Sequence, residues 1–265
     1  MKNLKIKNKT ILITGGSSGI GLELNNKLKE QNTVITLGTR ESKQENYYVC
    51  DVSDSEQVKQ AVSLIVNKFG KFDIIINNAG YGMSGATELI CVETQKKMID
   101  VNLFGIVNIV QNTLQHLNEN AKIINISSAS GLFCVPYRTM YAVSKSAVNM
   151  LTNGLRMELN NTSYQVTAIC PGNIKTNFTK NRVKEFETNS LYGNQIEEST
   201  LRLDSKEDKR MSVDKATDIM LKIISKKKLK PYYIIGNGIK ALNFFQRFVP
   251  KSLVEKITIK TMLKK

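Results

Sequence analysis

The sequence predicts an α/β fold, a doubly wound parallel sheet with helices on both of its faces. Short runs of β-branched residues alternate with longer amphipathic stretches along most of the chain. Of the 265 residues, 41% are hydrophobic, which is enough to bury one sizeable core. The first apolar run ends in a glycine-rich turn that opens a helix. Because strands that alternate with helices need crossover connections, they form a parallel sheet, here within a single domain.

The strands are predicted where β-branched and aromatic residues cluster between polar turns, at residues 10–14, 33–37, 47–50, 73–77, 122–127, 165–170 and 232–235. The helices are predicted where apolar residues recur with helical spacing, at residues 19–31, 54–69, 93–117, 141–160 and 213–226. Asp54 is the expected N-cap of the second helix, because Gln57 follows at capping-box spacing. Residues 177–212 are polar and weakly periodic, so we interpret them as a long excursion from the core.

The glycine-rich turn after the first strand has the context of a dinucleotide-binding site. Gly15 allows a tight turn, Gly19 lets the backbone approach a pyrophosphate, and Gly21 permits close helix packing. The phosphate groups would face the helix N-terminus. Taken by itself, the motif is also compatible with a plain turn between a strand and a helix.

Further motifs follow in a fixed order. Asn77-Asn78-Ala79-Gly80 ends the fourth strand, Ser128 follows the fifth, Tyr141 and Lys145 lie in the next helix, and residues 171–176 follow the sixth strand. In this order and spacing, the motifs resemble those of the short-chain dehydrogenase/reductase family, over roughly residues 8–236. The resemblance implies a Rossmann-fold oxidoreductase that acts on CH–OH groups with NAD(P)⁺ as acceptor. The excursion and the C-terminal region are loosely similar to 17β-hydroxysteroid dehydrogenase-like and other lipid-active reductases.

Tyr141 and Lys145 suggest a mechanism through their spacing alone. Residues four apart share a helix face, so the ammonium can lie near the phenol. A phenol with a pKa of about 10 is a poor acid or base at neutral pH, and a nearby cation lowers that pKa. Tyr141 could then protonate a carbonyl oxygen as hydride arrives, or deprotonate an alcohol in reverse. Tyr137 competes for this role, but it has no lysine four residues further on.

The resemblance implies a catalytic tetrad of Asn102, Ser128, Tyr141 and Lys145. In this tetrad Ser128 would hold the substrate oxygen, and Lys145 would also bind the nicotinamide ribose. Asn102 would hold a water molecule in the proton relay; the alternative is a buried polar residue bonded to backbone. Ser128 is preferred to Ser127 and Ser130, because the family's serine lies thirteen residues before its tyrosine.

The resemblance also assigns cofactor contacts by position. Besides Tyr141 and Lys145, the expected contacts are Gly15, Ser17, Ser18, Gly19, Ile20, Gly21, Thr39, Arg40, Asp51, Val52, Asn78, Ala79, Gly80, Pro171, Gly172, Ile174 and Thr176. Asp51 would contact the adenine, and the alternative is a loop residue or a cap for the next helix. Ala79 and Gly80 would approach the adenosine ribose. Ile174 and Thr176 would meet the nicotinamide carboxamide.

The end of the second strand favours NADP(H) over NAD(H). An acidic residue there would bond the adenosine ribose and repel a 2′-phosphate, but the stretch Leu37-Gly38-Thr39-Arg40 contains no acid, and the first one after it is Glu41. Arg40 could pair with the phosphate, while Ser18 and Thr39 donate hydrogen bonds to it. The stretch from Arg40 to Asp51 is shorter than usual in the family, and Arg40 lies one place later than the commonest basic position. NAD(H) is therefore kept as the alternative.

The substrate is expected to be a small carbonyl or alcohol compound of lipophilic character. The residues that motif position directs toward it are mostly apolar, and they are Phe133, Val135, Tyr137, Met140, Phe178, Phe186 and Leu191. The alternative is that these side chains only pack the excursion 177–212 against the body. A non-catalytic dinucleotide-sensing or scaffold protein is a second hypothesis, which the complete tetrad disfavours.

The formal net charge of +15 is concentrated at the chain ends, and residues 226–265 carry eleven Lys or Arg against Glu255 alone. We divide the chain into a catalytic domain at 1–238 and a basic extension at 239–265. The extension is expected to form two short amphipathic helices, separated at Pro250. Basic charge around an apolar face suits peripheral contact with an anionic membrane. The alternative is that the apolar residues pack on the core or on a partner subunit.

A nucleic-acid partner, a metal site and a membrane span are all disfavoured. Lysine greatly outnumbers arginine, so no nucleic-acid partner is expected. The four cysteines form no CxxC pair and His116 is the single histidine, so no metal site is expected. No apolar run is long enough for a membrane span, which predicts a cytoplasmic protein whose membrane contact, if any, is through the extension. By family analogy we expect a homo-oligomer, a dimer or tetramer.

Overall fold

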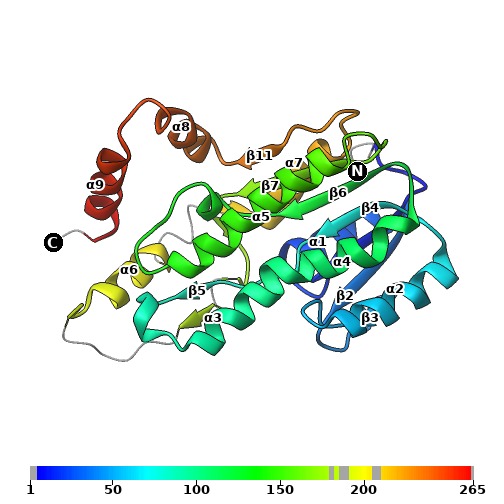
Figure 1. Ribbon diagram of the computed structural model, residues 1–265, viewed down its shortest axis with the longest axis horizontal. Coiled ribbons are helices and arrows are strands. Elements are labelled where there is room, and N and C mark those ends of the chain that lie inside the picture. Colours follow the sequence, from blue (N-terminus) through cyan, green and yellow to red (C-terminus); the bar gives the residue numbers. More distant parts are fainter. Residues whose placement is uncertain (1–4, 179–181, 185–190, 205–209, 264–265) are drawn as a thin grey trace.

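A parallel sheet of seven strands forms the centre of the protein (Figure 1). The computed structural model describes residues 5–178, 182–184, 191–204 and 210–263. The strands of the sheet are β1 (Thr10–Thr14), β2 (Thr33–Gly38), β3 (Tyr47–Val49), β4 (Phe72–Asn77), β6 (Leu117–Ile126), β7 (Gln165–Pro171) and β11 (Tyr232–Ile235). Their order is β11-β7-β6-β4-β1-β2-β3, so the chain winds outward from β1 in both directions. The predicted doubly wound α/β fold is confirmed.

Nine α-helices lie in the part of the chain that the structure describes. They are α1 (Gly19–Leu28), α2 (Ser55–Phe69), α3 (Val92–Ile99), α4 (Gly105–Thr113), α5 (Thr139–Glu158), α6 (Gln195–Asp204), α7 (Val213–Ile224), α8 (Asn237–Phe245) and α9 (Lys251–Met262). None of these helices is both long and apolar enough to span a membrane. Asp54 caps α2 as predicted, because its carboxylate accepts hydrogen bonds from the amides of Glu56 and Gln57 at 3.0 Å each.

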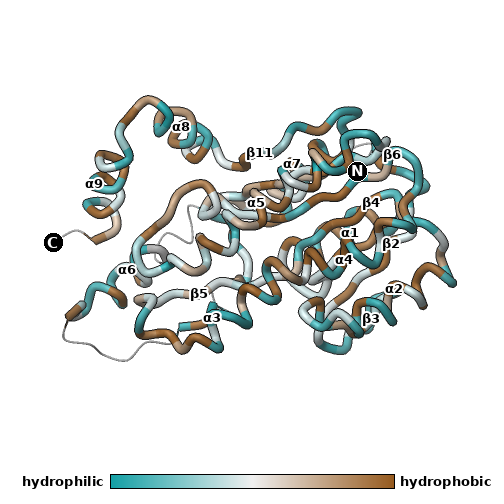
Figure 2. Tube along the Cα trace, viewed as in Figure 1, coloured by the Kyte–Doolittle hydropathy of each residue, from teal (hydrophilic) through white to brown (hydrophobic). Residues whose placement is uncertain are grey.

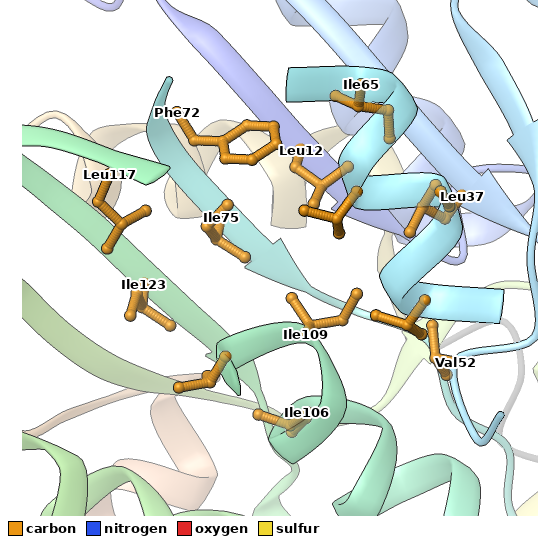
Figure 3. Packing of buried hydrophobic residues seen from close by; sticks show 14 of the residues in the cluster. Leu12, Leu37, Val52, Ile65, Phe72, Ile75, Ile106, Ile109, Leu117 and Ile123 are labelled. Carbon is orange, nitrogen blue, oxygen red and sulfur yellow. The ribbon is translucent and has the colours of Figure 1, made fainter. Parts of the chain in front are cut away.

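The two faces of the sheet are covered by different helices. Leu12 joins a cluster with residues of α2, α4 and α5, whereas its neighbours Ile11 and Ile13 join a cluster with residues of α1 and α7. Successive side chains of a strand point to opposite faces, so this alternation buries both faces. Figure 3 shows the first cluster, in which Ile65 of α2 and Ile109 of α4 pack toward the sheet. Apolar residues lie along the strands of the sheet (Figure 2).

The predicted helix at 93–117 is the main correction to the expected elements. It divides into α3, a π-helical turn at Asp100–Phe104, α4, and a 3-10 turn at Leu114–His116. A π-helical turn widens the helix by one residue, and such turns are frequent at functional sites. Here it places Asn102 beside the loop that follows β4. The next strand, β6, begins at Leu117 instead of 122, because Leu117 pairs with Phe72 across a register shift.

The excursion 177–212 is tied to the body by two pairs of short strands. β5 (Met83–Ser84) pairs with β9 (Val183–Lys184), and β8 (Ile174–Lys175) pairs with β10 (Met211–Ser212). Both pairs start from loops at the carboxyl ends of central strands, which is the edge where ligands bind in open α/β sheets. The excursion therefore returns to the same edge as the predicted site residues.

Candidate active site

The glycine-rich turn lies between β1 and α1, where the order of the strands reverses. Gly15 and Gly19 have φ values of +68° and +54°, in the left-handed region that favours glycine. A Cβ on Gly21 would lie 2.3 Å from the Gly15 carbonyl oxygen, so a larger residue would displace backbone. Ser18 is the N-cap of α1, but its side chain makes no capping hydrogen bond, and the first turn has no acidic residue. This helix N-terminus is suited to bind a pyrophosphate.

Asn78 links the motif at the end of β4 to the glycine-rich turn by hydrogen bonds. Its Nδ2 donates to the carbonyl oxygens of Thr14 and Gly15 at 3.0 and 3.1 Å. The backbone amides of Asn78 and Ala79 both donate to Oγ1 of Thr14 at 3.0 Å. The side chain of Asn78 therefore holds two loops together, and it leaves Ala79 and Gly80 as the residues of this motif nearest a ligand.

Tyr141 and Lys145 lie in the first two turns of α5, where their side chains are buried with Tyr141 8% and Lys145 5% exposed. Nζ of Lys145 donates to the carbonyl oxygen of Ile126, at the end of β6, at 3.0 Å. A Cβ on Gly80 would lie 3.5 Å from the same Nζ, so the amine sits between the ends of β4 and β6. Burial lowers the pKa of Lys145 to about 8. The helix thus directs both predicted catalytic side chains to the ligand-binding edge.

The surroundings of the Tyr141 phenol differ from the sequence prediction. Burial raises its pKa above the usual 10.0, and a hydrogen bond with Ser128 and the charges of Arg138 and Arg182 counteract part of this rise. The prediction named Lys145 as the cation acting on the phenol. In the cofactor-free protein the Lys145 amine donates to a backbone carbonyl oxygen, and the predicted action of its charge on the phenol stays a prediction. Sequence reasoning missed both arginines: Arg138 directly precedes α5, whereas Arg182 belongs to the excursion and carries no local signal.

The two adjacent serines after β6 have different partners. The Ser127 hydroxyl is buried and donates to the carbonyl oxygen of Lys145 at 3.0 Å, so it anchors α5. Ser128 accepts a hydrogen bond from the Ser130 amide at 3.1 Å and also interacts with the Tyr141 phenol. Ser128 is therefore the serine that the fold places beside the tyrosine.

Asn102 uses its side chain to hold the loop that follows Gly80. Its Oδ1 accepts from the Tyr81 amide at 3.0 Å, and its Nδ2 donates to the Tyr81 carbonyl oxygen at 3.1 Å and to Oγ of Ser144 at 3.0 Å. The side chain is fully buried. The alternative weighed for Asn102, a buried polar residue bonded to backbone, describes these contacts. A role in a proton relay would have to come from its main chain.

The end of β2 lies against the side chain of Tyr47. A Cβ on Gly38 would lie 2.3 Å from the Tyr47 hydroxyl oxygen and 3.5 Å from Oγ of Ser17. The Tyr47 hydroxyl donates to the carbonyl oxygen of Arg40 at 2.6 Å. Thr39 and Arg40 are exposed. Tyr47 thus occupies the space beside Gly38, and the side chain of Arg40 is exposed to solvent.

Three residues that were predicted to contact the cofactor make most of their contacts within the protein itself. Oδ1 of Asp51 accepts from the amide and the hydroxyl of Ser53 at 2.9 and 2.7 Å, which is the loop role weighed as its alternative. Val52 is buried against Gly105, whose Cβ would lie 2.6 Å from the valine side chain. Ile20 packs against the cluster below α1 and α7. Val52 therefore offers a ligand mainly its main chain, whereas the side chain of Ile20 is only partly buried.

A cavity of about 150 Å³ lies beside the motif at residues 171–176. Its lining consists of Gly172, Asn173, Ile174, Met211, Ile235, Gly236 and Ile239. Pro171 ends β7, and the Gly172 amide donates to the Ile235 carbonyl oxygen at 2.9 Å. A Cβ on Gly19 would lie 3.7 Å from the Thr176 side chain. The fold therefore brings the residues predicted to hold the nicotinamide next to the glycine turn.

Apolar side chains surround Tyr141. Met83, Ile90 and Met98 form a buried cluster with it, and Met140 and Phe178 pack against this cluster. The rings of Tyr141 and Phe178 are 5.7 Å apart. Tyr137 instead contacts the excursion, through Tyr192 and a hydrogen bond to Gln195. Leu191 is exposed, and Phe186 lies outside the described residues. In the described ranges, no group of three His, Cys, Asp or Glu side chains could hold a metal ion.

Comparisons with known proteins agree with this arrangement. The chain is 38% identical over 179 residues to a 3-ketodihydrosphingosine reductase of Bacteroides thetaiotaomicron, in a match that covers 65% of this chain and spans 66% of the reductase's length. It is 30% identical to a probable short-chain type dehydrogenase/reductase, VdlC, of Helicobacter pylori, over 91% of this chain and 93% of the relative.

Solved structures share the fold. A short-chain dehydrogenase/reductase from Burkholderia phymatum in complex with NAD superposes with a TM-score of 0.80 at 21% identity, covering 92% of this chain and 94% of that chain. A short-chain dehydrogenase from Burkholderia cenocepacia in complex with NADP has a TM-score of 0.75 at 21% identity, with 94% and 97% covered. The sequence profile of the short chain dehydrogenases matches residues 9–187. On this match, the chain belongs to the short-chain dehydrogenase/reductase family of oxidoreductases.

Proposed function

We propose that the protein interconverts a ketone or aldehyde and an alcohol, with NADP(H) as cofactor and Tyr141 as the general acid and base. The observation that carries the proposal is the buried phenol of Tyr141, in contact with Ser128 at the ligand-binding edge of the sheet. Bound NADP(H) supplies or accepts the hydride. The turn with positive φ at Gly15 and Gly19, and the absence of space for a Cβ on Gly21, fit a bound dinucleotide.

Tyr141 handles the proton. Tyr141 is protonated at neutral pH, so its phenol holds the proton that a carbonyl oxygen requires. Burial raises the pKa of the phenol, and the hydrogen bond with Ser128 counteracts part of this rise. The Ser128 hydroxyl next to the phenol can hold the same substrate oxygen by a hydrogen bond. Arg138 and Arg182 stabilise the phenolate that remains after proton transfer, since their charges oppose the effect of burial.

Lys145 supplies a cation one helical turn behind Tyr141. Its amine is held by the Ile126 carbonyl oxygen at 3.0 Å and lies near Gly80. From this position it can donate to ribose hydroxyls of a nicotinamide nucleotide seated along the edge. A bound cofactor would also change the solvation of this amine, so the pKa of about 8 applies to the free protein.

The preference for NADP(H) rests on the end of β2. Gly38 has no side chain and Thr39 carries no charge, so neither residue repels a 2′-phosphate. Arg40 is exposed, and Tyr47 holds its carbonyl oxygen. The guanidinium of Arg40 and the hydroxyls of Ser18 and Thr39 are the groups we assign to the 2′-phosphate.

We propose a lipophilic substrate, because the ring of Tyr141 lies among Met83, Ile90, Met98 and Phe178. The Bacteroides relative is named for a reduction of 3-ketodihydrosphingosine, which is in line with a substrate of this class. A homo-oligomer is proposed on family grounds, supported by exposed apolar residues of α5 such as Met150 and Met157. Cytoplasmic location with peripheral membrane contact through residues 239–265 completes the proposal.

The test is NADPH oxidation by the purified protein with a panel of steroids, aliphatic ketones, quinones and acyl ketones. Tyr141→Phe removes only the transferable proton, so turnover should fall by about 10² to 10⁴ while the Kd for NADPH stays near the wild-type value. Tyr164→Phe is the matched control, because it removes a phenol hydroxyl directly before β7, at the opposite end of that strand from Pro171. A Tyr141→Phe variant that keeps more than roughly a tenth of the wild-type rate of the chemical step would exclude this role.

A further inference from the structure

The last two helices expose an unusual number of large apolar side chains. Phe245 is 62% exposed and Phe248 is 72% exposed, although aromatic residues are commonly buried. We call the exposed apolar residues of α8, α9 and the turn between them the outer face: Leu242, Phe244, Phe245, Phe248, Leu253, Ile257 and Ile259. The aromatic rings are clustered, since Phe244 lies 5.7 Å from Phe245 and 5.2 Å from Phe248. Figure 1 shows both helices projecting from the end of the molecule.

The opposite side of α8 is fixed to the body. Asn243 is buried, and Ile239, four residues earlier on the same side, fills the space beside Gly172. A Cβ on Gly172 would lie 2.0 Å from Cδ1 of Ile239, so the isoleucine is in close contact with the turn that follows β7. Ile239, Phe245 and Phe248 recur at helical spacing and were expected on one apolar face, but the structure buries Ile239 against Gly172 and exposes the two phenylalanines. The packing of Ile239 determines which way the phenylalanines point.

Basic side chains surround the outer face. Lys240, Arg247, Lys251, Lys256 and Lys260 are exposed on or next to these helices, and Glu255 is the one acid among residues 226–265. Leu253 and Ile257 lie four residues apart and share a side of α9. Lys256 and Lys260 are also four residues apart and lie next to that side. Lys264 and Lys265 lie outside the described residues. Figure 2 shows the hydrophobic and hydrophilic residues interspersed along both helices.

We propose that the outer face docks on an anionic lipid bilayer, with the phenylalanines of α8 in the lipid interface and the basic residues at the headgroups. A bilayer with negative headgroups supplies apolar volume and opposite charge together. A second copy of this chain would bring another basic face against the first, so like charges would oppose the contact. Charge complementarity therefore favours the membrane as the occupant.

Docking would place the site close to the lipid. Ile239 lines the cavity next to Gly172 and Ile174. The helix α8 therefore carries part of the outer face and also forms one wall of that cavity. A lipophilic substrate could then pass from the bilayer along α8 to the site. This consequence rests on the proposed oxidoreductase function, whereas the docking itself does not depend on any turnover. The proposed domain boundary at 238 falls within α8, whose first residue is Asn237.

The experiment is co-sedimentation of the full-length protein with vesicles of phosphatidylcholine alone or of phosphatidylcholine with phosphatidylserine. We expect binding to the anionic vesicles that weakens at least severalfold between low and high salt, and little binding to the neutral ones. Phe245→Ser with Phe248→Ser should lower the affinity for anionic vesicles about tenfold or more. Leu64→Ser is the matched control, because Leu64 is equally exposed but lies on α2.

Replacing lysines separates the contribution of the basic residues to vesicle binding from that of the apolar residues. Replacing Lys251, Lys256 and Lys260 by Gln should reduce binding about tenfold or more and flatten its salt dependence. The same change at Lys59, Lys96 and Lys97, which are exposed on α2 and α3, should leave binding near the wild-type level.

Three outcomes would overturn the proposal. The first is equal binding of wild type and the double Phe variant to anionic vesicles, and the second is equal binding of wild type to both vesicle types. The third is a dimer in analytical ultracentrifugation that the double Phe variant abolishes without any vesicle binding, which would assign the face to a second copy. Because NADPH binding is measured separately, loss of the catalytic proposal would leave these results unaffected.

Discussion

The buried amine of Lys145 has a consequence for how stability depends on pH. The unfolded chain holds the lysine proton up to a pKa near 10.5, whereas the folded free protein releases it near a pKa of about 8. Between these values unfolding takes up a proton, so a rise in pH disfavours unfolding and stabilises the fold. Below about pH 8 Lys145 is protonated in both the folded and the unfolded state. Its contribution to the free energy of unfolding then levels off at its most unfavourable value.

The magnitude follows from the separation of the two pKa values. One pKa unit corresponds to about 1.4 kcal/mol, so the protonated amine costs the fold roughly 3 kcal/mol at pH 7. Since the unfolded lysine is partly deprotonated at pH 10, the cost there falls to about 1 kcal/mol. Wild type should therefore gain about 2 to 3 kcal/mol in free energy of unfolding between pH 7 and pH 10, relative to Lys145→Met.

The assay is urea unfolding of the cofactor-free wild type and of Lys145→Met at a series of pH values. Titrating groups that do not interact with Lys145 affect both proteins alike. Cys170, whose pKa the Lys145 charge lowers, has a pKa of about 11, so its thiol stays mostly protonated up to pH 10. The lost hydrogen bond to Ile126 is independent of pH to first order, so only the difference between the curves is interpreted. Parallel curves for the two proteins would show that Lys145 keeps an ordinary pKa, and the reasoning from its burial would be refuted.

Three further variants test other parts of the site. Arg40→Ala should raise the Kd for NADPH about tenfold or more and leave the Kd for NADH nearly unchanged, by calorimetry, since it removes a charge-assisted contact worth roughly 1.5 to 3 kcal/mol; equal affinity of wild type for both cofactors would contradict this. Gly21→Ala should lower the thermal midpoint and abolish cofactor binding, because its Cβ would meet the Gly15 carbonyl; a variant that binds NADPH normally would show that the turn can relax. Asn102→Ala should lose about 2 to 4 kcal/mol in urea unfolding, since the Tyr81 backbone groups lose their partners, and an unchanged midpoint would rule out this brace.

Local signals predicted the parts of the fold that depend on neighbours in the chain. The β-branched runs located all seven strands of the central sheet, because strand formation follows short-range pattern. The positive φ at Gly15 and Gly19 follows from the glycine turn itself. The spacing of Tyr141 and Lys145 placed both side chains at the start of one helix, since four residues make about one helical turn.

Contacts between segments that are far apart in the sequence were decided only by the tertiary structure. That Lys145 faces the Ile126 carbonyl, and that Arg182 acts on the Tyr141 phenol, depends on how the sheet, α5 and the excursion pack. The direction of the C-terminal phenylalanines was likewise set by Ile239, which packs beside Gly172 from 67 residues further along the chain. Periodicity describes which residues of a helix share a face, but the face that is buried is chosen by the surface that the rest of the fold offers.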